Sequence, residues 1–142
     1  MDREENQGRM KNIRVSAAVI HDGSSIFATE RGYGEWKGKW EFPGGKREEG
    51  ENGVDTSIRE IMEELETRIE VEDFLCTVEY DYPSFHLTMD TYIAKVVEGK
   101  LILKEHEDAK WIPLPLLDDL DWLDADKAVV QEVKRYFSLK GI

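Results

Sequence analysis

The residues best suited to chemistry are three glutamates near the middle of the chain, Glu60, Glu63 and Glu64. At roughly 100° per residue, these side chains fall together on one face of an α-helix. Like charges at this spacing repel one another, and a hard cation relieves that repulsion. Oxygen donors of this kind suit Mg²⁺ or Mn²⁺ rather than zinc or copper. The cluster is therefore a candidate metal site, although most groups of glutamates are solvated faces of a helix.

The segment that carries these glutamates is predicted to be a helix docked on an apolar core. Asn52 is a suitable N-cap residue, and Asp55 follows three positions later. A second face of this helix is apolar, and its residues are Val54, Ile58, Ile61 and Leu65. Gly44 and Gly45 precede the helix, and glycine allows the backbone to approach a ligand closely. The pattern predicts a helix that presents its carboxylates to a cleft beside a glycine-containing loop.

The spacing of these residues resembles the signature of the Nudix hydrolases. Five residues separate Gly45 from Glu51, and seven more separate Glu51 from the run REIMEE at 59–64. The family pattern then ends with a glycine and an apolar residue, where this chain has Glu66 and Thr67. Glycine suits the left-handed conformation at a helix end, so its loss is expected to weaken that end by about 1 kcal/mol. It removes no metal ligand.

The resemblance implies roles for most residues of the signature. The implied ligands of Mg²⁺ or Mn²⁺ are the Gly45 carbonyl oxygen and the carboxylates of Glu60, Glu63 and Glu64. Glu63 and Glu64 are also implied to be catalytic. Arg59 is implied to orient these carboxylates, with Glu51 as its partner, and so to support the site structurally. Glu105 matches a downstream glutamate of the family, either as the general base or as a further ligand. It is otherwise a surface carboxylate in the acidic run 105–108.

The order of elements across 13–136 is similar to the MutT-like branch of the family, the nucleoside triphosphate pyrophosphohydrolases. The candidate substrate-binding residues are Arg31, Lys46, Tyr82, Phe85 and Asp126. Arg31 and Lys46 are cations suited to phosphate, and Tyr82 and Phe85 are rings on which a base can stack. Asp126, if ionised, accepts hydrogen bonds only, which suits a cytosine amino group or the altered edge of 8-oxoguanine. Asp126 is equally well placed to be the N-cap of the last helix.

The fold class implied by the resemblance is α/β, an α/β/α sandwich with a mixed β-sheet between helices. The sequence pattern itself predicts strands at 13–20, 25–30, 40–42, 76–82, 85–97 and 109–112. It also predicts a helical turn at 116–120 and an amphipathic helix at 126–139. We expect residues 1–11 to be a flexible N-terminal arm and residues 12–142 to be a single Nudix hydrolase domain.

The composition limits the partners of the chain. It has 142 residues, a formal net charge of −12 and one cysteine. So acidic a chain is not expected to bind a nucleic-acid polymer, which usually meets a basic patch. A nucleotide remains compatible, because a bound metal neutralises its phosphates. One cysteine forms no internal disulfide, and no apolar run reaches the length of a membrane span. We therefore expect a cytoplasmic protein without membrane contact, either a monomer or a homodimer.

The expected reaction is metal-dependent hydrolysis of a nucleoside or deoxynucleoside triphosphate to the monophosphate and pyrophosphate. A cytidine or an oxidised nucleotide is the favoured substrate. Two alternatives remain open. One is hydrolysis of another nucleoside diphosphate derivative, such as ADP-ribose. The other is a nucleotide-binding sensor without catalysis, against which the retention of all three glutamates argues.

Overall fold

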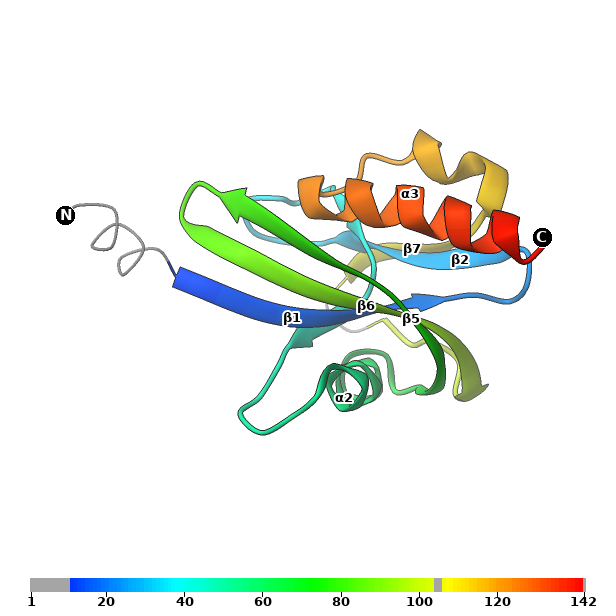
Figure 1. The fold of residues 1–142 in the computed structure, drawn as a ribbon, viewed down its shortest axis with the longest axis horizontal. Coiled ribbons are helices and arrows are strands. Elements are labelled where there is room, and N and C mark those ends of the chain that lie inside the picture. Colours follow the sequence, from blue (N-terminus) through cyan, green and yellow to red (C-terminus); the bar gives the residue numbers. More distant parts are fainter. Residues whose placement is uncertain (1–10, 104–105, 142) are drawn as a thin grey trace.

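A computed structural model describes residues 11–103 and 106–141, whose strands form two sheets (Figure 1). The four-stranded sheet has the order β4-β1-β6-β5, and the three-stranded sheet has the order β3-β2-β7. The strands of the first sheet are β4 (Gly44–Lys46), β1 (Lys11–Ile20), β6 (Phe85–Glu98) and β5 (Arg68–Tyr82). Those of the second are β3 (Trp40–Glu41), β2 (Ser25–Arg31) and β7 (His106–Pro113). Because β1 is parallel to β6 and antiparallel to β4, the first sheet is mixed.

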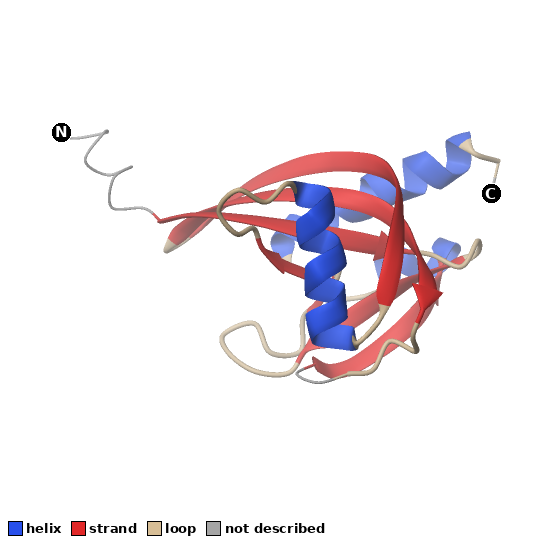
Figure 2. Ribbon diagram, turned by 90° about the horizontal axis from the view of Figure 1, so that it is seen from below, coloured by secondary structure: helices blue, strands red, loops and turns tan. Residues whose placement is uncertain are grey.

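Helices lie on both sides of the strands, which confirms the expected α/β class. Helix α2 (Gly53–Leu65) lies on one side, and helix α3 (Asp124–Leu139) lies on the other (Figure 1). A short 3₁₀ helix, η1 (Leu114–Asp119), connects β7 to the segment before α3. Figure 2 shows α2 in front of the strands and α3 behind them. Among the described residues, no helix is both long and apolar enough to cross a membrane.

The apolar core has two parts because β1 is buried on both faces. Successive side chains of a strand point to opposite faces. Ala17 and Val19 accordingly pack in the larger cluster, with residues of α3, whereas Ala18 and Ile20 pack against α2. Ile61 is fully buried in the α2 cluster. Trp40 belongs to the larger cluster and is buried.

Both ends of α2 follow from its sequence. The Asn52 side chain accepts a hydrogen bond from the Asp55 backbone N–H at 2.8 Å, which is the expected N-cap. The helix ends at Leu65 and is followed by the capping residue Glu66, whose φ of 51° and ψ of 40° are left-handed. The expectation that Glu66 occupies a position favouring glycine is therefore confirmed. The end is held by a bond from the Glu66 N–H to the Met62 carbonyl at 3.0 Å.

Several predicted boundaries were wrong, among them the following three. Strand β1 begins at Lys11 and not at Ile13, because Lys11 pairs with Phe85 of β6. Residues 1–10, most of the expected arm, lie outside the described residues. Strand β5 runs unbroken from Arg68, since irregularities in its register absorb the polar residues that obscured its pattern. Helix α3 begins at Asp124 with Leu123 as its N-cap residue and no side-chain cap, so Asp126 is not the N-cap.

Candidate active site

The guanidinium of Arg59 is the centre of the polar network on α2. Its Nε donates to Glu51 Oε2 at 2.7 Å, and its Nη2 donates to Glu51 Oε1 at 2.9 Å. Two parallel bonds of this kind fix the orientation of both groups. The Arg59 hydrogen bonds hold the pKa of Glu51 at about 2, well below its usual range. Nη2 also donates to the Lys46 carbonyl at 3.0 Å, which ties the helix to the end of β4. The expected partnership of Arg59 and Glu51 is therefore present.

Two of the predicted metal-binding carboxylates share the third nitrogen of the same guanidinium. Arg59 Nη1 lies 2.9 Å from Glu60 Oε2 and 3.2 Å from Glu63 Oε1. The Glu60 side chain is mostly buried, whereas that of Glu63 is 58% exposed. Glu64 lines a small cavity of about 100 Å³ beside Gly44. Glu60 and Glu64 therefore lie beside β4, and Glu63 is joined to Glu60 through Arg59.

Gly45 and Glu60 fit each other in a way that requires glycine. A Cβ on Gly45 would lie 2.2 Å from the Glu60 carboxyl carbon, far inside contact distance. The missing side chain thus brings the Glu60 carboxylate against the backbone of β4. In the described part of the chain, no three acidic, histidine or cysteine side chains already form a ready metal cluster. The donor set is nevertheless all oxygen, and it fits Mg²⁺ or Mn²⁺ once the carboxylates gather on one ion.

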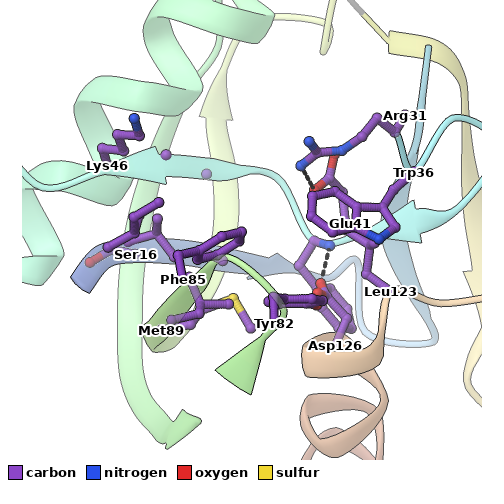
Figure 3. A pocket seen from close by; sticks show the side chains of 17 residues that line it. Ser16, Arg31, Trp36, Glu41, Lys46, Tyr82, Phe85, Met89, Leu123 and Asp126 are labelled. Atoms are coloured by element: carbon purple, nitrogen blue, oxygen red, sulfur yellow. Dashed lines mark hydrogen bonds and ion pairs between the residues drawn. The ribbon is translucent and has the colours of Figure 1, made fainter. Parts of the chain in front are cut away.

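A larger cavity of about 260 Å³ adjoins the small one, with which it shares Arg31, Glu41 and Gly44. Figure 3 shows its side chains, which come from β1, the end of β2 and the loop after it, the segment of β3 and β4, the ends of β5 and β6 that form their hairpin, and the start of α3. All five residues that the sequence nominated for substrate binding line it: Arg31, Lys46, Tyr82, Phe85 and Asp126. Mostly apolar walls with a few polar groups are typical of a site for a small organic molecule.

Aromatic rings form one wall of the cavity. The rings of Tyr82 and Phe85 stack, with centroids 5.1 Å apart, and the Trp36 ring lies 5.1 Å from that of Tyr82. The Tyr82 hydroxyl accepts a hydrogen bond from the Ala125 backbone N–H at 3.1 Å. Burial raises the pKa of Tyr82 to about 12, so the phenol stays neutral at physiological pH. The wall therefore offers flat, uncharged surfaces to a planar ligand.

Asp126 is the buried acid of this cavity. Its side chain comes from the first turn of α3 and accepts a hydrogen bond from the Phe42 N–H at 2.9 Å (Figure 3). The residue is 4% exposed, and loss of hydration raises the pKa of its carboxyl group to about 8. Burial thus favours the neutral form of the Asp126 carboxyl group, which can donate a hydrogen bond as well as accept one, over the ionised form, which only accepts.

Arg31 lies where the larger and the smaller cavity meet, since it lines both together with Glu41 and Gly44. Its Nη2 donates to Glu41 Oε1 at 2.7 Å. Its Nε is buried and makes no hydrogen bond to any described residue. Arg31 therefore presents a cation at the passage from the aromatic walls to the carboxylate helix.

The lining of the cavity also includes residues that were not predicted to contribute to the site, among them Trp36 and Glu41. Trp36 lies in the loop between β2 and β3, and a tryptophan there could equally have been a core residue. Glu41 had a signal: it alternates with buried Trp40 and Phe42, so its side chain must point to the other face. The remaining predicted residue, Glu105, lies outside the described residues.

Comparison with known proteins agrees with this geometry. Residues 10–133 match the family model described as NUDIX domain. The 8-oxo-dGTP diphosphatase of Escherichia coli is 30% identical over 128 residues, 89% of this chain and 99% of that protein. The CTP pyrophosphohydrolase of the same organism is 29% identical over 103 residues, 72% of this chain and 76% of that protein. The crystal structure of a MutT NUDIX hydrolase from Burkholderia pseudomallei superposes with a TM-score of 0.77 at 25% identity. That match covers 87% of this chain and 98% of the other.

Proposed function

This chain belongs to the Nudix family as a MutT-like hydrolase, and we propose that it converts a nucleoside or deoxynucleoside triphosphate to the monophosphate and pyrophosphate. The observation that carries this proposal is that the aromatic cavity and the small cavity beside the glutamates of α2 have lining residues in common. Gly44 lines both the aromatic cavity and the small cavity that Glu64 lines. A base held among the rings therefore has its phosphates directed along β4 to the carboxylates of α2.

Residues of α2 and β4 are proposed to bind the metal ion and to neutralise the phosphates. The Gly45 carbonyl, Glu60, Glu63 and Glu64 would hold Mg²⁺ or Mn²⁺. When bound, such an ion offsets phosphate charge and makes water more acidic. Arg59 keeps Glu60 and Glu63 oriented through its contacts at 2.9 and 3.2 Å. Lys46 and Arg31 balance the charge of the phosphate chain. Glu105 is the favoured general base, which would take the proton of the attacking water as the bond between the α- and β-phosphates breaks; its alternative role is that of a further metal ligand.

The base is proposed to be an oxidised purine or cytosine. Two similar proteins carry the names 8-oxo-dGTP diphosphatase and CTP pyrophosphohydrolase, and the Asp126 carboxyl group is suited to either ring. One of its oxygens is engaged by the Phe42 N–H, and the group lines the cavity. In its neutral form it pairs with a base edge that offers a donor beside an acceptor. Both cytosine and 8-oxoguanine have such an edge. Such an enzyme would act on free nucleotides of the cytoplasm and would not bind a nucleic-acid polymer.

Turnover of a nucleotide panel tests this proposal. Normal and oxidised NTPs and dNTPs, together with ADP-ribose, would be incubated with the protein and Mg²⁺, and loss of substrate followed by chromatography. We expect one triphosphate to be consumed far faster than ADP-ribose.

The variant Glu64→Gln keeps the shape of the side chain but removes one ligand charge, so it should fold normally and lose orders of magnitude in kcat. Two outcomes of the substrate panel would favour the alternatives. Preferred turnover of ADP-ribose would instead support a diphosphate-derivative hydrolase. Tight nucleotide binding without any turnover would support a sensor.

A further inference from the structure

A second polar network, outside the cavity, begins at a buried carboxylate on β6. Asp90 is 5% exposed and receives hydrogen bonds from neighbouring strands on both sides. Thr77 of β5 donates to its Oδ1 at 2.7 Å, and Arg14 of β1 donates to its Oδ2 at 3.1 and 3.3 Å. Arg47 Nη1 reaches the same Oδ2 at 3.4 Å. Asp90 is therefore a fixed anchor on the sheet, and the hydrolytic mechanism makes no use of it.

The shorter hydrogen bonds of Arg47 are made not to Asp90 but to the backbone of the loop before α2. Its Nε and Nη2 both donate to the Glu51 carbonyl oxygen, at 3.1 and 2.9 Å. Arg14 and Thr77 already satisfy Asp90, so Arg47 is not needed to neutralise it. Its guanidinium instead joins a rigid strand to one carbonyl group in a loop. That carbonyl belongs to the residue immediately before the N-cap of α2.

The clamped residue is the one that orients Arg59. The Glu51 side chain holds Arg59 through two hydrogen bonds, and Arg59 in turn contacts the Glu60 carboxylate at 2.9 Å. The two arginines brace the loop from both ends, because Arg59 holds the Lys46 carbonyl and Arg47 holds that of Glu51. A shift of the Glu51 backbone would therefore move Arg59 and, through it, Glu60.

We propose that Arg47, anchored on Asp90, is a positioning residue for the metal-binding glutamates of α2. This inference rests on the proposed role of Glu60 as a metal ligand. Groups that orient metal ligands from behind typically affect metal affinity or activity about 10–100-fold when they are removed. A buried ion pair contributes little net stability compared with apolar packing. We therefore expect the main effect of the Arg47–Asp90 pair to be on the position of the loop before α2, and not on overall stability.

Arg14 supplies a matched control, because both arginines pair with Asp90 Oδ2 but only the Arg47 guanidinium reaches the Glu51 carbonyl. Arg47→Met keeps the apolar stem and leaves Asp90 paired with Arg14. Arg14→Met makes the same change on the other side of Asp90. Each variant leaves the buried carboxylate with one cation, so neither creates an unpaired buried charge.

The primary readout is Mn²⁺ binding to the nucleotide-free protein, measured by calorimetric titration or by the electron paramagnetic resonance of free Mn²⁺. Arg47→Met should weaken Mn²⁺ binding by about ten-fold, and Arg14→Met should leave it near the wild-type value. With saturating Mg²⁺, kcat of Arg47→Met should fall by about ten-fold while KM for the nucleotide changes less than about two-fold. Unchanged Mn²⁺ affinity in Arg47→Met, or equal weakening in both variants, would overturn the proposal.

Two further variants keep the result interpretable. Arg47→Lys retains the charge beside Asp90 and should fold even if Arg47→Met does not. A single ammonium group cannot reproduce the planar fork that spans the carboxylate and the carbonyl, so this variant should also bind Mn²⁺ more weakly. Wild-type affinity in Arg47→Lys would contradict the positioning role.

Glu60→Gln in the same titration tests the premise that Glu60 is a metal ligand. If it binds Mn²⁺ normally, the proposed metal site fails. If it binds weakly while Arg47→Met binds normally, only the positioning role fails.

Discussion

Arg59 and Glu51 are joined by two parallel hydrogen bonds, of 2.7 and 2.9 Å, across the loop that precedes α2. This pair links the loop to the helix, and the remaining Arg59 nitrogen contacts two of the candidate metal ligands. A guanidinium that contacts three carboxylates orients them and also offsets their repulsion. The geometry explains why the cluster on α2 tolerates its charge before any cation binds.

Glu51→Gln should lower the melting temperature at neutral pH, and the difference from wild type should shrink in acid. The pKa of Glu51 is lowered from 4.5 to about 2, chiefly by the Arg59 hydrogen bonds. A lowered carboxyl pKa stabilises the fold above the unfolded pKa, and the stabilisation is lost as pH falls toward the folded value. Thermal unfolding between about pH 7 and pH 2.5 would measure it. Glu48→Gln is the control, since Glu48 is 67% exposed and lies 3.7 Å from Arg59. A pH-independent difference in Glu51→Gln would contradict the assignment.

Asp126→Asn should stabilise the ligand-free protein, and increasingly so as pH rises. Burial raises the pKa of Asp126 from 3.8 to about 8. Between these values the unfolded chain releases the proton while the folded chain keeps it, so wild-type stability falls as pH increases. The gap in melting temperature should therefore widen from about pH 5 to about pH 8. Asp124→Asn is the control, because hydrogen bonds from Lys127 and Tyr80 lower the pKa of Asp124. A constant gap for Asp126→Asn would mean that Asp126 is ionised throughout.

Asp126→Ala tests whether the same group selects the base. The variant should lose about ten-fold or more in kcat/KM for the preferred nucleotide, because such hydrogen bonds are worth roughly 1–3 kcal/mol. The kcat/KM for poor substrates should fall much less, so the ratio of kcat/KM between the preferred and the poor nucleotides should decrease. The measurement is kcat/KM for the best and the worst nucleotide of the panel. Equal slowing of all nucleotides, or a lower melting temperature alone, would show that Asp126 supports the Phe42 backbone and does not select the base.

Glu66→Gly should raise the free energy of unfolding by about 1 kcal/mol with little change in turnover. Glu66 has a φ of 51°, a left-handed value that glycine adopts without a steric cost. Denaturant titration compares the variant with wild type. Glu66→Ala separates the backbone effect from loss of the carboxylate, since alanine retains the Cβ and should give no gain. Loss of stability in Glu66→Gly would show that contacts of the Glu66 side chain outweigh the relief of its backbone.

Local pattern was sufficient to predict the carboxylate helix, because its cap, its apolar stripe and its glutamates are all set within 16 residues of sequence, 51–66. The cavity was predicted only as a set of residue types. Tyr82 and Asp126 are 44 positions apart, and their meeting depends on how α3 packs against the β5–β6 hairpin. The raised pKa of Asp126 depends on the same packing. The Arg47–Asp90 link was missed for a similar reason, since neither residue has a local pattern and their contact spans 43 positions.

The most direct measurement is ³¹P NMR of the products formed from the preferred triphosphate with Mg²⁺. A nucleotide held with its base among the rings and its phosphates along β4 should be cleaved between the α- and β-phosphates. We predict resonances of pyrophosphate and of the nucleoside monophosphate in equal amounts, and their absence in the same reaction with Glu64→Gln. Orthophosphate with a nucleoside diphosphate, or unchanged triphosphate in the wild-type reaction, would contradict the account.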